Sequence, residues 1–339
     1  MASRIVLGIV IIALLGGTGF FVMNYKVESH SENGKFSYLK ITPRENSAEP
    51  QAAAPDTPAN NNLPLPQTNR STFRIATYNL GGLDEGKLCN IRVSDILSQL
   101  FRRFDLIAVE GLRGKNQGVP ARLIEQLNAA GGRQYDFITC PTQQRDGVEH
   151  YSGFLFDKAV MEVDRATVRF VEDPQRRFHH KPLVGLFRTR ASPTPFTFYL
   201  VAVDTDPEKP APELDLLADV FRAVRDAKRA DGLSEDDVIM LGDFEADDHH
   251  LGRLGNVPGI AAAIGDIIPT TTRGTKMADN ILFDRRASTE FTGRAEVFDT
   301  MREFELTVQA AADVSEHLPV WAEFSVFEGG PRGFMPRTE

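Results

Sequence analysis

The stretch VIMLGDFEAD at residues 238–247 decides how the chain is interpreted. Its first four residues are apolar and predict a strand that is buried on both faces. Gly242 then lets the backbone turn, which places Asp243 at the carboxyl end of that strand. Ligand chemistry often lies at this edge of an α/β sheet, and Asp243, with Glu245 and Asp247 close behind, could hold a hard divalent cation. An acidic turn after a core strand is the simpler interpretation, so other parts of the chain must decide.

Length and composition limit the class of protein. With 339 residues, of which 42% are hydrophobic, the chain can form one large domain plus accessory segments. Its net charge of −9 argues against a protein that holds nucleic acid by bulk electrostatics, because that mode needs clustered Lys and Arg. The two cysteines, Cys89 and Cys140, exclude a zinc cluster and a disulfide scaffold, and their spacing leaves open whether they pair.

A run of 19 uncharged residues, 5–23, is rich in Ile, Val, Leu and Gly. At about 1.5 Å per residue it just crosses a hydrocarbon core of about 30 Å. Arg4 precedes it, which predicts a cytoplasmic N-terminus. A cleaved signal peptide is the alternative, but the run ends in GFFVM rather than in a small-x-small site. We therefore expect a transmembrane anchor over residues 1–25, with the domain outside the cytoplasm, either periplasmic or extracellular.

The residues that follow the anchor change in composition. Residues 26–40 are polar with a possible short strand, and residues 41–70 are rich in Pro, Ala, Asn and Gln. Such a segment buries too little apolar surface to offset its ordering entropy, so we expect an extended tether over 26–70. The folded domain is expected at 71–327, followed by a loose tail at 328–339.

Hydrophobic patterning predicts a mixture of strands and a few long helices. The expected strands are 73–80, 106–109, 134–139, 151–156, 167–170, 183–188, 196–203, 238–241, 280–283 and 320–327, and the expected helices are 90–104, 120–130 and 211–228. This order favours an α/β (α+β) fold, a two-layer β-sandwich flanked by helices.

Polar clusters stand at the ends of these strands, where a purely structural domain has no need of them. They are Thr77-Tyr78-Asn79, Glu110-Gly111-Leu112-Arg113, Glu149-His150-Tyr151, Asp204-Thr205-Asp206, residues 242–247, Asp279-Asn280 and Ser315-Glu316-His317-Leu318-Pro319. Their order and spacing resemble the endonuclease/exonuclease/phosphatase superfamily, the fold of deoxyribonuclease I, apurinic endonucleases, sphingomyelinases and inositol phosphatases. The resemblance covers residues 73–327 and implies a deoxyribonuclease I-like sandwich.

The resemblance also implies a chemistry. In that superfamily water attacks a phosphoester while one or two Mg²⁺ ions and polar side chains neutralise the charge that develops on phosphorus. The implied cofactor is Mg²⁺, with Mn²⁺ or Ca²⁺ as alternatives, and the implied partner is a phosphoester substrate, possibly a nucleic acid. No protein partner can be inferred from the sequence.

Five residues match motif positions whose roles the resemblance supplies. Asn79 would orient an oxygen bound to metal or phosphate. Asp243 would position or deprotonate the attacking water. His317 matches the His of the terminal Ser-Asp-His motif, and Asp279 with Asn280 matches a pair that supports one catalytic His.

Further positions are assigned in the same way. Glu149 and Tyr151 fall where the superfamily keeps a Glu that steadies a catalytic His and an aromatic hydroxyl near the phosphate. Arg113 lies where deoxyribonuclease-like members place a DNA-contacting Arg. His180 belongs to the basic stretch 176–181, which lies where such members contact the phosphate backbone; a solvated loop is the simpler interpretation of that stretch.

Four positions depart from the superfamily pattern. Glu110-Gly111 replaces Gln-Glu, so the carboxylate points the opposite way unless a bulge restores it. Asp204 replaces the first catalytic His, and an Asp donates a proton near neutral pH only if its pKa is strongly raised. Glu245 replaces an Asn that binds phosphate. Glu316 replaces an Asp and keeps the carboxylate on a longer stem.

Two functions follow. In the first, the carboxylates of Glu110, Asp204, Asp243, Glu245 and Glu316 are redistributed and still support metal-dependent phosphoester hydrolysis. We then expect Asp204 among the catalytic residues, Glu110, Asp243 and Glu316 as metal ligands, and Arg113, His180, Glu245 and Asn280 as substrate contacts. In the second, the domain is an inactive extracytoplasmic binding module, because losing a main ligand and a main acid removes orders of magnitude in rate. A structural envelope protein is a third class.

Overall fold

The computed structural model describes residues 25–32, 35–43, 70–114, 118–140, 143–145, 148–227, 232, 235–265 and 268–330, with side chains from residue 70 onward except at 143–145 and 148. The chain divides into two units, Met1–Leu63 and Pro64–Glu339. In the first unit β1 (Tyr25–Glu32) pairs antiparallel with β2 (Lys35–Pro43). A hairpin therefore replaces part of the extended tether that we expected over 26–70.

The predicted anchor and tail fall on other parts of the chain. Residues 1–24 and 331–339 lie outside the described residues. Within the described ranges, no helix is both long enough and apolar enough to cross a membrane. The anchor and the rest of the tether therefore stay predictions. Residues 328–330 of the predicted loose tail are hydrogen-bonded to the domain, and residues 331–339 stay a prediction.

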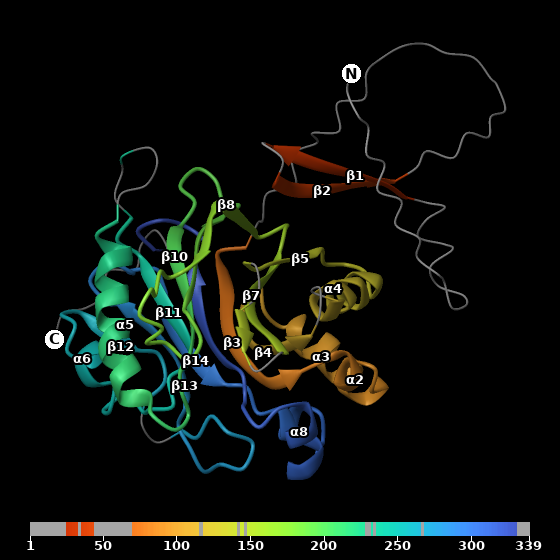
Figure 1. Ribbon diagram of the computed structural model, residues 1–339. Helices are drawn as coiled ribbons and strands as arrows, with labels where there is room; N and C mark the ends of the chain where they lie inside the picture. The colour runs from red at the N-terminus through yellow and green to blue at the C-terminus, as the bar shows by residue number, and fades with distance from the viewer. Residues whose placement is uncertain are drawn as a thin grey trace. The chain divides into compact units, whose positions relative to one another are not determined.

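The second unit contains two mixed sheets (Figure 1). The six-stranded sheet has the order β12-β13-β11-β10-β9-β8, and the seven-stranded sheet has the order β14-β15-β3-β4-β7-β5, with β6 paired to β7. The strands are β3 Thr72–Leu83, β4 Leu106–Gly114, β5 Tyr135–Ile138, β6 Gln143–Arg145, β7 Val148–Asp157, β8 Met161–Phe170, β9 Leu183–Thr189, β10 Thr197–Asp204, β11 Val238–Asp243, β12 Ile260–Ala262, β13 Asp279–Asp284, β14 Phe291–Val297 and β15 Val320–Ser325.

Helices cover the outer faces of both sheets. They are α2 Glu85–Leu88, α3 Ile91–Phe101, α4 Gly118–Ala129, α5 Pro210–Arg225, α6 Gly252–Gly255, α7 Thr300–Glu303 and α8 Val308–Val314. Buried residues of α3 and α4 pack with those of β3 and β4, and buried residues of α5 pack with those of β10 and β11. Figure 1 shows these two helical layers on opposite sides of the sheets. The predicted two-layer sandwich flanked by helices is confirmed.

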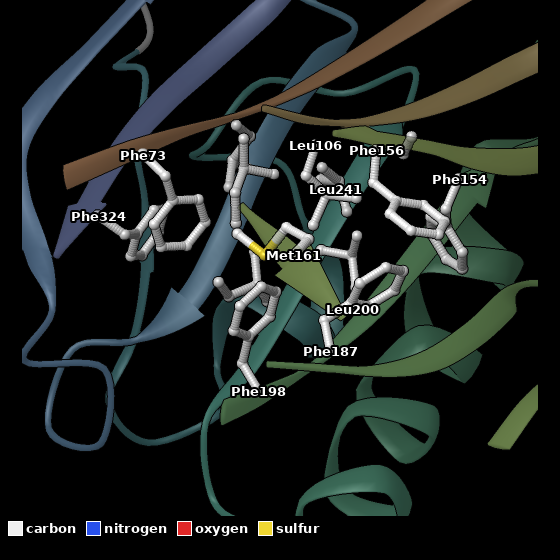
Figure 2. Packing of buried hydrophobic residues seen from close by; sticks show 14 of the residues in the cluster. Phe73, Leu106, Phe154, Phe156, Met161, Phe187, Phe198, Leu200, Leu241 and Phe324 are labelled. Carbon is white, nitrogen blue, oxygen red and sulfur yellow. The ribbon is translucent and has the colours of Figure 1, made fainter. Parts of the chain in front are cut away.

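The space between the sheets is filled largely by phenylalanine. Phe73, Phe198 and Phe324 contact one another or their neighbours from strands of both sheets, and Phe154 packs edge-on against Phe187 at a centroid distance of 5.2 Å (Figure 2). All five are essentially inaccessible to solvent. Large aromatic side chains bury the most area per residue, so this core fixes the two sheets relative to each other.

The strand register gathers the polar clusters at one edge of the sandwich. Asp204 lies opposite Asp243 in the parallel pair β10–β11, and Asp243 lies opposite Asp279 in the pair β11–β13. Gly242 has φ +142°, and a Cβ there would lie 2.0 Å from the carbonyl oxygen of Val203. Only glycine therefore lets β11 approach β10 closely enough to bring these carboxylates together.

Candidate active site

Asn79 and Asp243 form the centre of the polar edge. Asn79 is at the end of the regular pairing of β3, 7% exposed, and its Nδ2 donates to Asp243 Oδ2 at 3.0 Å. Its Oδ1 accepts from the backbone N–H of Gly81 at 2.9 Å, which fixes the amide orientation. Asp243 Oδ1 accepts from the backbone N–H of Glu245 at 3.0 Å. Both side chains are therefore held in one orientation from opposite sheets.

Asp279 and His317 lie beside Asp243. The Nδ1 of His317 lies 2.9 Å from Asp279 Oδ2, and its Nε2 lies 3.6 Å from Asp243 Oδ2. Thr270 Oγ1 donates to Asp279 Oδ2 at 2.9 Å, and Ser315 Oγ accepts from the backbone N–H of His317. The imidazole is thus positioned by a carboxylate that is itself held, as we expected for Asp279.

The charges of this group depend on one another. Burial alone would lower the pKa of His317, but the carboxylates of Asp279 and Asp243 outweigh it and raise that pKa to about 10. Burial, followed by the charge of Asp279, raises the pKa of Asp243 well above its ordinary value, while His317 lowers it. The carboxylates therefore favour a proton on the His317 imidazole, while burial disfavours the charged form of Asp243.

Across from His317, a second imidazole lies beside a carboxylate. His180 Nδ1 is 3.0 Å from Asp204 Oδ2, and Asp204 Oδ1 accepts a long hydrogen bond of 3.4 Å from Asn79 Nδ2. The His180 ring stacks on the ring of His150 at a centroid distance of 5.7 Å. The side chain of His180 is only 20% exposed, so it is not the solvated loop residue that we favoured.

The donor set fits a divalent cation. Ligand atoms of Asp243, Asp279 and His317 all lie within 4.8 Å of one another. Among the described atoms, Asp279 Oδ1 is buried without a hydrogen-bond partner. A buried carboxylate oxygen in that condition is costly unless a cation or a proton neutralises it. Asp243 and Asp279 would hold such an ion through oxygen, with His317 at its side.

Comparison with known proteins shows which proteins the chain is similar to. No family model matches it. Its sequence is 26% identical over 271 residues to deoxyribonuclease gamma of Rattus norvegicus, in an alignment that covers 74% of this chain and 83% of that protein. The structure of a humanized D. rerio TDP2 aligns with a TM-score of 0.53 at 17% identity and covers 75% of this chain and 99% of its own. The D. rerio TDP2 complexed with single strand DNA product aligns with a TM-score of 0.52 at 15% identity, with coverages of 75% and 99%.

In sequence and in fold, the chain is therefore similar to the endonuclease/exonuclease/phosphatase superfamily.

Gly111 stands where the sequence resemblance implied a Glu. A bulge in β4 lies between Val109 and Leu112, and Gly111 adopts φ +67° within it. A Cβ at this position would lie 2.5 Å from Asn79 Oδ1. The backbone therefore has no room for the Glu that the superfamily pattern places there.

Glu110 points inward from the same bulge. It is inaccessible to solvent, and Thr77 Oγ1 donates to its carboxylate at 3.2 Å. Burial, and then the charges of Asp204 and Asp279, raise its pKa well above the ordinary value. The bulge thus turns this carboxylate toward the site. Such a bulge was the condition under which we expected the Glu110 carboxylate to point toward the site.

The three residues predicted as metal ligands are not brought together. Glu316 is exposed, and its charge acts on Lys87. Within the described residues, neither Glu110 nor Glu316 belongs to a group whose ligand atoms lie within 4.8 Å of one another. Asp243 alone of the predicted ligands lies in the cation group, which it shares with Asp279 and His317.

Glu245 is neutralised by a residue that sequence reasoning missed. Lys276 Nζ lies 3.0 Å from Glu245 Oε2, and this hydrogen bond is the main cause that raises the pKa of Lys276. Glu245 has φ +50°, a left-handed conformation that Asn adopts more readily than Glu. Nothing in the spacing of the sequence indicates Lys276, because it lies in the long loop before β13.

His150 and Tyr151 of the Glu149-His150-Tyr151 cluster lie on opposite faces of β7. The Tyr151 ring packs in the layer between the seven-stranded sheet and its helices, and burial, with the charges of Glu149 and Glu85, raises its pKa to about 12. Side chains alternate along a strand, so His150 points the opposite way, toward His180. The predicted role of Tyr151 near the phosphate is therefore not supported by this geometry, and the predicted role of Glu149 in steadying a catalytic His stays a prediction.

Asn280 differs from its predicted role, whereas the predicted role of Arg113 stays a prediction. The Asn280 side chain is 6% exposed and bonds to the backbone of Ile264 through both of its polar atoms, at 3.1 and 2.9 Å. It therefore holds a loop rather than a substrate. Arg113 is exposed, with its guanidinium close to Gly82 at the rim of the cleft.

Proposed function

We propose that the protein is a divalent-metal-dependent phosphodiesterase of the nuclease type. The observation that carries this proposal is the convergence of Asn79, Asp243, Asp279 and His317 at one sheet edge, joined by hydrogen bonds and including a buried carboxylate oxygen without a donor. The similarity to deoxyribonuclease gamma of Rattus norvegicus favours nucleic acid as the substrate.

A bound divalent ion would supply positive charge that stabilises the developing negative charge on the phosphoryl oxygens. Asp243, oriented by Asn79, would accept the proton of the attacking water as its oxygen forms a bond to phosphorus. His317, held through Nδ1 by Asp279, would donate its Nε2 proton to the leaving oxygen as the old phosphorus–oxygen bond breaks. The short separation of His317 Nε2 and Asp243 Oδ2, 3.6 Å, offers a route for the proton to return.

The opposite side of the cleft also supports hydrolysis. Asp204 occupies the position of the superfamily's first catalytic His, but His180 brings an imidazole to its carboxylate at 3.0 Å. Imidazole and carboxylate are therefore both present, contributed by different elements than the superfamily pattern implies. A second histidine is therefore available to the proposed hydrolysis.

Gly111 favours a second candidate function, an inactive binding module. The superfamily's principal metal-binding Glu is missing there, and the backbone has no room for it. Such a module would bind a phosphoester or nucleic acid in the cleft without turning it over.

We also propose that the domain lies outside the cytoplasm and is anchored to the membrane through residues 5–23. Protease accessibility in intact cells tests that placement.

The test of the proposed activity is cleavage by the purified full chain of supercoiled plasmid, single-stranded oligonucleotide and bis(4-nitrophenyl) phosphate. Each substrate is incubated with Mg²⁺, Mn²⁺, Ca²⁺ or EDTA. We expect nicking or cleavage with at least one ion and none with EDTA. Rates equal to buffer under every condition, with retained binding of the oligonucleotide, would favour the binding module instead.

A further inference from the structure

A second group of carboxylates lies at the opposite end of β11 from Asp243. Asp237 directly precedes β11, Glu290 directly precedes β14, and Glu328 follows β15. Their ligand oxygens all lie within 4.8 Å of one another. Asp237 is 3% exposed and Glu290 1% exposed, while Glu328 lies at the surface. This cluster is outside the cleft and independent of the proposed function.

Two oxygens of the cluster are buried without a hydrogen-bond donor. Among the described atoms, Asp237 Oδ1 and Glu290 Oε2 are inaccessible and have no partner. The other oxygen of Glu290 accepts from the backbone N–H of Gly329 at 2.6 Å, so the side chain is fixed with its second oxygen turned into the cluster. None of the ion pairs between described residues includes Asp237, Glu290 or Glu328. Buried carboxylates are normally paired or bound to a metal, so these oxygens are suited to bind a cation.

We propose that Asp237, Glu290 and Glu328 bind a divalent cation, preferably Ca²⁺. The donors are all oxygens, which hard cations select. Calcium–oxygen distances are about 2.4 Å, so two ligands on opposite sides of one ion stand about 4.8 Å apart. Ligand atoms that all lie within 4.8 Å of one another are therefore close enough for one ion to reach all three carboxylates.

The local environment makes the cluster unstable without a neutralising charge. Burial, with the charges of neighbouring carboxylates, raises the pKa of Asp237 to about 8 and that of Glu290 to about 7. The Ser288 hydroxyl beside Asp237 partly offsets this rise, and the buried carboxylate of Glu235 offers a further oxygen. A cation removes the repulsion that otherwise has to be removed by protons.

The ion would connect the two sheets. Asp237 enters the six-stranded sheet through β11, whereas Glu290 and Glu328 flank strands of the seven-stranded sheet. Glu328 also ties the end of the domain to the start of β10, because its backbone N–H donates to the Thr194 carbonyl at 3.0 Å and its Oε2 accepts from the Thr197 N–H at 3.3 Å. The expected consequence of binding is a more stable sandwich with unchanged cleft geometry.

The test measures thermal unfolding of the full chain carrying Asp243→Asn, so that an ion in the cleft contributes little. After treatment with EGTA, the melting temperature is recorded at pH 8 with and without 1 mM Ca²⁺, at constant ionic strength. We expect Ca²⁺ to raise it by about 5 °C, as expected when the ion is present at roughly 100 times its dissociation constant. Adding Glu290→Gln, which keeps the shape but removes the charge, should abolish the shift.

Glu296→Gln in the same background is the matched control, because Glu296 is an exposed carboxylate on β14, and it should keep the full shift. If the Glu290 variant does not fold, Glu328→Gln at the exposed edge should raise the half-saturating Ca²⁺ concentration about 10-fold. The proposal is overturned if Ca²⁺, Mg²⁺ and Mn²⁺ all leave the melting temperature unchanged, or if the shift persists with Glu290→Gln. If Ca²⁺ does not change the melting temperature of the Asp243→Asn chain, and adding Glu290→Gln raises that temperature without metal, protons rather than a cation neutralise the cluster.

Discussion

The two sides of the cleft hold their polar side chains in different ways. On the side of β11 and β13, Asp279 binds His317 Nδ1 at 2.9 Å and is itself held by Thr270. On the side of β4 and β10, Asp204 receives only a 3.4 Å hydrogen bond from Asn79, and His180 reaches it from the loop before β9. The first side keeps the superfamily motifs, and the second departs from them.

The difference shows which property of the site survives substitution. Both sides present an imidazole next to a carboxylate, although on the second side the carboxylate stands where the pattern has the imidazole. The bulge at Gly111 removes one carboxylate, while Glu110 from the same bulge adds its charge near Asp204. Each side of the cleft therefore has an imidazole paired with a carboxylate. Only on the side of β11 and β13 do these groups come from the chain positions that the superfamily pattern implies.

Replacing His317 tests the retained side and should have the largest effect of the comparison. Loss of a positioned acid lowers turnover by about 10³-fold. We expect His317→Ala to show this fall in kcat with each active metal ion. His250→Ala, which changes an exposed histidine near the cleft, should leave kcat unchanged. A loss of less than 10-fold would mean that the retained side does not carry the chemistry.

Restoring the superfamily Glu at position 111 should damage the site rather than improve it. The new Cβ would displace the Asn79 amide that orients Asp243, so we expect kcat to fall about 10²-fold and stability to drop by about 3 kcal/mol in urea unfolding. Gly131→Glu is the control, because Gly131 has a similar φ of +71° with nothing within 4 Å of its Cβ position. Gly131→Glu should lose less stability than Gly111→Glu, because only backbone strain acts on it, and it should keep full activity. Higher activity in Gly111→Glu would contradict the described bulge.

Replacing His180 tests whether the altered side takes part in hydrolysis. We expect His180→Ala to lower kcat about 30-fold, within the range for one positioned polar group and below the effect at His317. A double-mutant cycle with Asp204→Asn should give a coupling energy of about 1 kcal/mol or more, because the two side chains are in contact. Additive effects of the two substitutions, or a His180→Ala activity equal to that of the native chain, would show that only the side of β11 and β13 takes part in hydrolysis.

Replacing Glu245 should have the smallest effect and should be favourable. Glu245→Asn removes an anion from the phosphate side and places a residue that tolerates the left-handed backbone, so we expect KM to fall about threefold and stability to rise by about 0.5 kcal/mol. Glu305→Asn provides the control, because Glu305 has nearly the same φ, +51°, at an exposed position. It should gain stability without a change in KM. A higher KM for Glu245→Asn would show that the Lys276 pair itself is needed.

The sequence predicted the sandwich and the retained side because their signals are local. A buried strand followed by Gly242 and Asp243 indicates both where the strand ends and which carboxylate lies at its end. The order of Asn79, Asp279 and His317 along the chain predicted the other residues of this side. Parallel and antiparallel neighbours then bring such strand ends to one edge without further information.

The altered side could not be predicted, because its contacts are made by loops and by side-chain direction. His180 reaches Asp204 from 24 positions away through a loop, and Lys276 reaches Glu245 from 31 positions away. Tyr151 was predicted near the phosphate, but the face of β7 that carries His150 is the one directed toward His180. Asn280 looked like a site residue by position, yet its amide is used up by the backbone of Ile264.

The most direct test of the central claim is plasmid nicking and diester cleavage by Asp243→Asn with the ion that best supports the native chain. The substituted amide would keep the shape of the side chain but could not accept the water proton, so we predict a fall in rate of at least about 10³-fold with unchanged circular dichroism. Asp247→Asn, in the same turn but bonded to His250, should stay within about threefold of the native rate. Equal rates for the native chain and Asp243→Asn would contradict the account.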